Sequence, residues 1–283
     1  MQRVSEKRWF VCLLAIVGII GASLFVVSLI QTPNNSFLCS LTNYSQNDNN
    51  PTSFQQLNTI LHYATSSITP QQSFSEITVT LDVLKSLNRP CNFLIFGLGI
   101  DSLMWNSFNP RGTTLFLEED PSWFQKVMKN APQLNAHAVK YRTQLREADA
   151  LLSSYRSEPF CSPARAAPLR SNERCKLALN NLPDEVYEKE WDLIMIDAPK
   201  GYFAEAPGRM AAIFSAAVMG RNRKGSGVTH VFLHDVDRKV EKVYAEEFLC
   251  RKNLVKGVGR LWHFEIPSKV NSTRHGDDDD RFC

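Results

Sequence analysis

The sequence predicts an α/β fold: a mostly parallel sheet with helices on both of its faces. Short apolar runs typical of strands alternate along the chain with segments whose apolar residues recur at helical spacing. One apolar run, 93–96, stops at a turn containing Gly97 and Gly99, and a helical segment follows at once. Because strand, glycine turn and helix open many nucleotide-binding units, this stretch is the first candidate for a ligand site.

Two amphipathic segments, 54–66 and 73–87, precede that strand and are separated at Pro70. We expect both to form helices that pack beside the first strand. The strands of the core are predicted, from apolar or alternating runs, at 93–96, 113–117, 136–141, 191–196, 230–233 and, as a closing edge strand, 260–266. Helices are predicted, from the spacing of apolar residues, at 103–108, 123–130, 144–155, 184–188, 207–219 and 240–249.

The amino-terminal segment predicts a single membrane anchor. Residues 9–30 form an uncharged apolar run of 22 residues, long enough to cross the ~30 Å hydrocarbon core as a helix. Three of residues 1–8 are basic, whereas the first charge after the run is Asp48, so the amino end is expected in the cytosol and the bulk in a lumen. The alternative is a cleaved signal peptide, but its apolar core is shorter than this run.

Beyond the run, the chain divides by composition. Residues 31–53 are rich in Asn, Ser, Thr and Gln and are expected to form a flexible stem, while 54–283 are expected to form one folded domain. The net charge of +3 comes largely from the basic amino end. The remainder is close to neutral, so we expect no nucleic-acid partner.

The cysteines indicate an oxidising compartment. One of the seven, Cys12, lies in the apolar run, which leaves an even number after it. Several pairings are open, and the pairing we favour is Cys161–Cys175, Cys250–Cys283 and, from the two left over, Cys39–Cys91. Sequons for N-glycosylation begin at Asn34, Asn43 and Asn271.

An adenosine site is predicted where the first two strands end. The two glycines let a ligand approach the backbone, and an acidic pair about twenty residues later can accept hydrogen bonds from both ribose hydroxyls. These features do not separate NAD from S-adenosylmethionine, although the missing third glycine suits the aminoacyl part of the latter better than a pyrophosphate. The predicted cofactor-binding residues are Gly97, Gly99, Asp101, Ser102, Glu118 as the first choice for the ribose, and Glu119 as the second.

Reactive groups are predicted at the ends of two later strands. Asp197 follows the run 191–196, and His234 and Asp235 follow the run 230–233. Because parallel strands bring their carboxyl ends to one edge, these three side chains are expected together as the catalytic group. Each could take a proton from an acceptor hydroxyl, and the three together could also hold a divalent ion. A structural role at the edge of the core is the alternative for the histidine.

Cations and aromatic rings follow Asp197 closely. Lys200, Tyr202 and Arg209 are predicted to bind an acidic sugar, because a guanidinium fork fits a carboxylate and a ring can stack on a pyranose. The tyrosine could equally fill the core. The later cations of 221–224 are interpreted as belonging to an exposed loop.

Several runs together resemble one protein family. The runs CNFLIFGLGIDSLMW, TTLFLEED, WDLIMIDAPKGYFAEAPGRMAAIFSAAV, THVFLHDVDR and EEFLCRK are similar to the plant Golgi family of glucuronic acid 4-O-methyltransferases, over about 54–283. The resemblance implies a Rossmann-like class I methyltransferase fold in a catalytic domain, S-adenosylmethionine as donor, and the 4-hydroxyl of a glucuronosyl side chain as acceptor. It also implies a Golgi membrane protein with that domain in the lumen.

The branch of the family is indicated by finer likenesses. The runs YRTQL and FLCRK are most similar to the arabinogalactan branch, whose acceptor is the glycan of arabinogalactan or of an arabinogalactan protein. The glucuronoxylan branch is the alternative, and its members usually carry His where this chain has Ile100. Two other classes stay open: a Golgi glycosyltransferase that uses Asp235, Val236 and Asp237 as a metal-binding D-x-D, and a non-catalytic scaffold.

Overall fold

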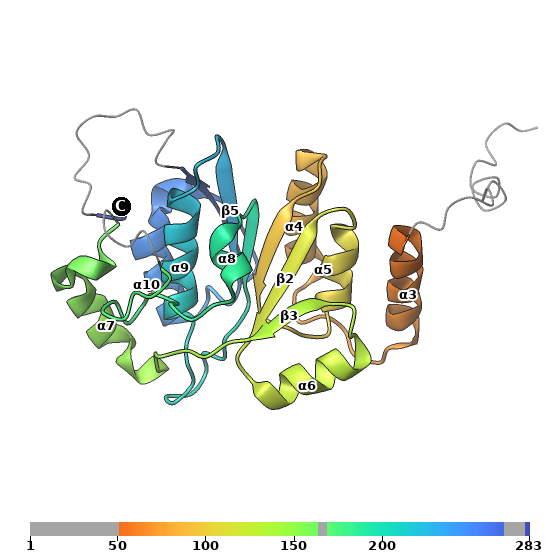
Figure 1. Cartoon of the computed structure of the whole chain (residues 1–283), viewed down its shortest axis with the longest axis horizontal. Coiled ribbons are helices and arrows are strands. Elements are labelled where there is room, and N and C mark those ends of the chain that lie inside the picture. The colour runs from red at the N-terminus through yellow and green to blue at the C-terminus, as the bar shows by residue number, and fades with distance from the viewer. Residues whose placement is uncertain (1–50, 164–168, 269–280) are drawn as a thin grey trace, which may run out of the picture. The chain divides into compact units, whose positions relative to one another are not determined.

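The computed structural model describes residues 51–163, 169–268 and 281–283, and the described part forms one compact unit, Thr52–Cys283. Its centre is a seven-stranded sheet of order β3-β2-β1-β4-β5-β7-β6 (Figure 1). The strands are β1 Asn92–Phe96, β2 Thr113–Glu118, β3 Asn135–Ala138, β4 Leu193–Ile196, β5 Val228–Leu233, β6 Leu254–Val258 and β7 Leu261–Pro267. The first five pair in parallel, and β7 runs antiparallel to both of its neighbours. This confirms the predicted Rossmann-like, mostly parallel sheet.

Helices cover both faces of the sheet, as predicted. They are α3 Pro51–Thr65, α4 Phe74–Leu87, α5 Ser102–Phe108, α6 Pro121–Asn130, α7 Ala148–Ser154, α8 Asp184–Glu188, α9 Met210–Arg221 and α10 Lys239–Tyr244, which continues as a π-helix, Ala245–Cys250. Short 3-10 segments occupy Leu145–Glu147, Tyr155–Ser157, Pro159–Cys161 and Arg251–Asn253.

Two apolar cores follow from the alternation of side chains along the strands. Phe93 and Ile95 of β1 pack in one core with α4, α5 and α6, whereas Leu94 and Phe96 pack in the other with α7 to α10. Since every residue of β4 is buried, the central strands read as continuous apolar runs, and this is why the sequence predicts them well.

The edge of the sheet differs from the prediction. The run 260–266 is not the edge strand: β7 lies between β5 and β6, and β6 forms the edge. The sequence does not predict β6 because this strand is half exposed along its length, contains Gly257 and is offset by a bulge. It therefore lacks the apolar alternation that marks a strand.

The two leading helices also differ from one another. Helix α4 packs on the core beside β1, as predicted. Helix α3 does not, because it lies against α5: the hydroxyl of Thr59 is 2.6 Å from that of Ser107, and Tyr63 donates a hydrogen bond to the carbonyl of Ile100. Its apolar residues are exposed instead, among them Leu57, Ile60 and Leu61.

Both cysteine pairs that the structure can test are confirmed, Cys161–Cys175 and Cys250–Cys283. Cys91 is buried and forms no disulfide with a described residue, and its predicted partner Cys39 lies outside the described residues. The predicted anchor 9–30, most of the stem and the sequons also lie outside them. Within the described ranges, no helix is long and apolar enough to span a bilayer.

Candidate active site

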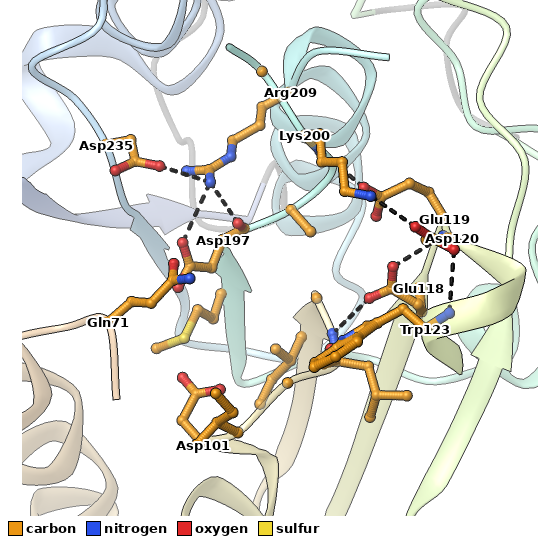
Figure 2. Close-up of a pocket in the computed structure, with 18 of the residues that line it drawn as sticks. Gln71, Asp101, Glu118, Glu119, Asp120, Trp123, Asp197, Lys200, Arg209 and Asp235 are labelled. Carbon is orange, nitrogen blue, oxygen red and sulfur yellow. Dashed lines mark hydrogen bonds and ion pairs between the residues drawn. The ribbon is translucent and has the colours of Figure 1, made fainter. Parts of the chain in front are cut away.

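A cavity of about 410 Å³ lies beyond the carboxyl ends of β1, β2 and β4. This is the point at which the strand order reverses between β1 and β4, where open α/β sheets bind their ligands. Figure 2 shows Glu118 and Trp123 on one side of it, Asp197, Arg209 and Asp235 on the other, and Asp101 below Asp197. The prediction of a site at these strand ends and the cavity therefore coincide.

The glycine turn forms the floor of the first side. Gly97 adopts a φ of 128°, and a Cβ there would lie 3.3 Å from the Cβ of Ala198, so this position requires glycine. The N–H of Gly99 donates to the hydroxyl of Ser102 at 2.8 Å. Ser102 is buried behind the turn and does not line the cavity, so its contact shapes the turn; Asp101, by contrast, does line the cavity.

The acidic run after β2 is fixed by hydrogen bonds. The carboxylate of Glu118 accepts the N–H of Leu98 at 3.1 Å and that of Asp120 at 2.9 Å. Burial, with the neighbouring charge of Glu119, raises the pKa of Glu118 to about 7. Burial likewise raises the pKa of Asp101 to about 6, and the charge of Asp197 adds to this shift.

Trp123 is a cavity residue that the sequence analysis placed only in a helix. Asp120 caps α6 by accepting the N–H groups of Ser122 and Trp123, and this places the indole at the cavity. The indole N–H donates to the carbonyl of Leu98 at 2.6 Å, so the ring lies beside the glycine turn. Its position in the first turn of the helix after β2 is the signal that could have identified it.

The three predicted catalytic residues do meet, but they are not equivalent. Nδ1 of His234 lies 3.0 Å from the carboxylate of Asp197, whose other oxygen accepts from Gln72 at 3.1 Å. Asp197 and Asp235 line the cavity, whereas the His234 side chain is 1% exposed and lies behind them. Only Asp197, 19% exposed, offers a substantial carboxylate surface to a ligand.

Asp197 and His234 stabilise each other's charged forms. Burial opposes ionisation of Asp197, but the hydrogen bond from His234 and the charge of Arg209 outweigh it and hold the pKa of Asp197 well below its ordinary value. Burial opposes the charged form of His234 as well, yet the hydrogen bond to Asp197 raises the pKa of the imidazole. An ionised carboxylate therefore faces the cavity with a hydrogen-bonded imidazole behind it.

Arg209 occupies a different place from the one expected of a sugar-binding residue. Its side chain is 5% exposed, and it forms ion pairs with Asp235 at 2.8 Å and Asp197 at 3.3 Å. It also donates to the carbonyls of Asp197 and His234. Most of its guanidinium is thus committed within the protein, where it compensates two buried carboxylates.

The outer part of the cavity is formed by the loop that follows Asp197. Lys200 is held by an ion pair with Asp120 at 2.7 Å, which raises the pKa of Lys200. Tyr202 is 67% exposed and contacts Phe203 edge-on, so the rings face outward instead of filling the core. Arg238, which the sequence analysis did not single out, also lines this part.

Two later cations, Arg221 and Arg223, lie outside the cavity. Arg221 donates to the carbonyls of Phe248 and Phe282, and Arg223 forms an ion pair with Asp192. They stabilise the π-helix, the carboxyl tail and the amino end of β4, and neither lines the cavity. The interpretation of Arg221 as part of an exposed loop is therefore wrong.

Known proteins resemble this chain over most of its length. A family model described as IRX15/IRX15L/GXM matches residues 75–264. Arabinogalactan O-methyltransferase 2 of Arabidopsis thaliana is 58% identical over 285 residues, covering 100% of this chain and 97% of the relative. Glucuronoxylan 4-O-methyltransferase 1 of the same plant is 50% identical, with 74% and 72% covered, and Protein IRX15-LIKE is 39% identical, with 77% and 69% covered. The fold, the cavity and these matches together place the chain in the IRX15/IRX15L/GXM family.

Proposed function

We propose that this protein is an S-adenosylmethionine-dependent polysaccharide O-methyltransferase that methylates the 4-hydroxyl of glucuronic acid on arabinogalactan. The observation that carries the proposal is the 58% identity, over the whole chain, to Arabinogalactan O-methyltransferase 2. The 4-hydroxyl is suggested by the name of the glucuronoxylan relative, Glucuronoxylan 4-O-methyltransferase 1. Glucuronoxylan itself is the alternative acceptor.

The donor fits the glycine side of the cavity. Glu118 would accept the ribose hydroxyls, because each of its oxygens already holds one backbone N–H and keeps a lone pair. Asp101 would face the ammonium of the aminoacyl part, and the indole of Trp123 gives an apolar surface for the base. When bound, the donor supplies a methyl group on a positively charged sulfur.

The acceptor hydroxyl would meet Asp197. The donor would supply the methyl group, which the oxygen of the acceptor hydroxyl would take to leave the neutral thioether of S-adenosylhomocysteine, while the hydroxyl proton would pass to the carboxylate of Asp197. Since the pKa of Asp197 is low, this carboxylate orients the hydroxyl throughout and accepts the proton only as the new bond forms. His234 and Gln72 hold the carboxylate in place.

A divalent ion fits the donor chemistry of this cluster. Asp197, His234 and Asp235 each place a ligand atom within 4.8 Å of the others. The guanidinium of Arg209 contacts both carboxylates, so it competes with an ion for them and already supplies positive charge there. No step of the transfer therefore needs to pass through a metal.

We also propose that residues 9–30 anchor the protein in the Golgi membrane, with residues 1–8 in the cytosol and the catalytic domain in the lumen. The uncharged run and its basic flank support this orientation, and the two disulfides suit an oxidising lumen. Protease protection of the full chain in sealed Golgi vesicles tests it. Digestion of the carboxyl-terminal domain without detergent would contradict it.

A glycosyltransferase is disfavoured by the surroundings of the D-x-D residues. Asp235 is buried in ion pairs with arginines, while Asp237 is exposed, so the two do not form one metal site. A scaffold without catalysis predicts no binding of S-adenosylmethionine. Calorimetry with the full chain tests the scaffold. Binding of S-adenosylmethionine that is abolished in Glu118→Ala would exclude it.

The decisive assay offers the full chain labelled S-adenosylmethionine with arabinogalactan and glucuronoxylan side by side. We expect 4-O-methylglucuronic acid in the hydrolysed arabinogalactan and a lower rate on glucuronoxylan. Asp197→Asn should lower the rate of methyl transfer by about a hundredfold or more while the donor still binds. A positioned proton acceptor contributes a rate enhancement of about that size. If neither polymer were methylated, the proposal would be overturned.

A further inference from the structure

An acidic acceptor needs a cation at the cavity, and the structure narrows the choice. The lining cations are Lys200, Arg209 and Arg238. Lys200 is directed to Asp120 on the donor side, and Arg209 is almost fully buried. Lys200 is 41% exposed but is paired with Asp120 at 2.7 Å, so Arg238, 32% exposed at the cavity wall, is the cation available on the acceptor side.

Two contacts orient the guanidinium of Arg238 and leave some of its N–H donors available. It directly precedes α10, with Nη2 at 3.0 Å from Asp235 and Nη1 at 3.7 Å from Glu241. A guanidinium carries five N–H donors in a planar fork, so these contacts orient it and leave donors for a ligand. Preorganisation of this kind lowers the entropic cost of binding a carboxylate.

Several guanidinium groups gather around one carboxylate beside Arg238. Asp235 alone forms ion pairs with three guanidinium groups, those of Arg209 at 2.8 Å, Arg238 at 3.0 Å and Arg260 at 2.6 Å. Glu241 is fully buried, neither of its oxygens has a hydrogen-bond partner among the described residues, and burial raises its pKa toward the neutral form. One more carboxylate, supplied by a ligand, would complete the arrangement.

Gly201 keeps this guanidinium uncovered. A Cβ at that position would lie 2.7 Å from an oxygen of Glu241 and 3.7 Å from Nη1 of Arg238. The backbone at Gly201 thus lies close to the buried carboxyl, and a side chain there would have to displace Glu241. The exposed ring of Tyr202 borders the same part of the cavity.

We propose that Arg238 binds the carboxylate of the acceptor's uronic acid and sets the preference for glucuronic acid over a neutral sugar. The inference rests on the proposed function. In a glucuronosyl ring the carboxyl group and the 4-hydroxyl are attached to adjacent carbons, so their binding groups must be neighbours. Arg238 and Asp197 line the same cavity and are linked by successive ion pairs through Asp235 and Arg209.

The test compares two acceptors with the full chain: a glucuronosyl-terminated arabinogalactan oligosaccharide and its carboxyl-reduced, glucosyl-terminated counterpart. We expect wild type to prefer the first. Arg238→Gln should lower kcat/KM for it by about a hundredfold, mainly through KM, and leave the neutral acceptor nearly unchanged, because a site built for a charged partner loses that partner's contact. Arg238→Lys should recover part of the loss.

Arg260→Gln is the matched control. It removes a guanidinium from the same carboxylate of Asp235, but Arg260 does not line the cavity. This variant should keep the preference, and both Gln variants should bind S-adenosylmethionine with wild-type affinity, which shows that they are folded.

Each contrary result has its own meaning. Preference retained in Arg238→Gln, or lost equally in Arg260→Gln, would overturn the inference, as would a wild type that methylates both acceptors equally. A wild type that methylates neither acceptor would instead contradict the proposed function.

Discussion

The ionisation of each carboxylate at this cavity depends on the charged groups beside it. Arg209 lies between Asp197 and Asp235 and makes it possible to bury two carboxylates beside a ligand site. A buried charge that loses its partner is costly, so the arginine matters for stability as well as for the reaction. Glu118 forms no ion pair with a cation in the part of the chain that the structure describes, and its pKa moves in the opposite direction.

Arg209→Gln should lower the free energy of unfolding by about 3 kcal/mol or more, because two buried carboxylates lose their compensating charge. Chemical denaturation measures this loss. Arg251→Gln is the control: Arg251 is exposed, and its ion pair with Glu246 should contribute about 0.5 kcal/mol or less. Similar losses in the two variants would contradict the central role of Arg209.

The affinity for S-adenosylmethionine should depend on pH through Glu118. Its pKa is raised to about 7, so the carboxylate that we propose accepts the ribose hydroxyls is fully ionised only above that pH. Affinity should therefore rise between pH 6 and pH 8 and fall as the group becomes protonated below 7. Calorimetry across this range measures the change.

Glu118→Gln is the control for this dependence. Its amide is isosteric but does not titrate, so the affinity should be lower and flat with pH. An equally steep pH dependence in this variant would assign the titration to another group, such as Asp101.

At the scale of elements, the last residues, 281–283, pack against the domain. Phe282 packs against Phe214, Phe248 and Tyr155, and the disulfide between Cys250 and Cys283 holds it there. The disulfide joins residues 33 apart in sequence, so it restricts the unfolded chain as well.

Replacing Cys250 and Cys283 together by Ser should lower the free energy of unfolding by about 3 to 5 kcal/mol, through the lost constraint and a loosened Phe282. Denaturation under non-reducing conditions measures it. The matched pair is Cys161 and Cys175, 14 residues apart, which should cost less. A loss of under about 1 kcal/mol at the tail would mean that packing alone holds it.

At the scale of the whole molecule, the sequence predicts those elements that are formed by buried apolar residues. The central strands and the cavity at their carboxyl ends follow from apolar runs and the residues after them, and so does the meeting of Asp197 with His234. The exposed strand β6 carries no such pattern, and the sequence does not predict it. The apolar spacing of 54–66 does predict the helix α3, but its packing beside β1 was predicted wrongly, because the apolar residues Leu57, Ile60 and Leu61 are exposed.

The roles of the arginines could not be read from the sequence for a related reason. Arg209 and Arg238 have similar local contexts, each just before a helix. Which one is buried depends on the tertiary position of Asp235, between β5 and α10. Only the assembled fold separates the arginine that compensates the protein's own carboxylates from the one that faces the cavity.

Lys200 gives the two halves of the cavity a common support. Its backbone N–H donates to Glu119 and its ammonium pairs with Asp120, while Tyr202, two residues on, borders the acceptor side. Donor and acceptor binding should therefore be thermodynamically linked. The S-adenosyl ligand, by contacting the acidic run to which Lys200 is bonded, should tighten acceptor binding by about fivefold or more, and the acceptor should tighten donor binding by the same factor. Acceptor affinities measured with and without S-adenosylhomocysteine test this linkage, and Lys200→Met should reduce the factor toward one.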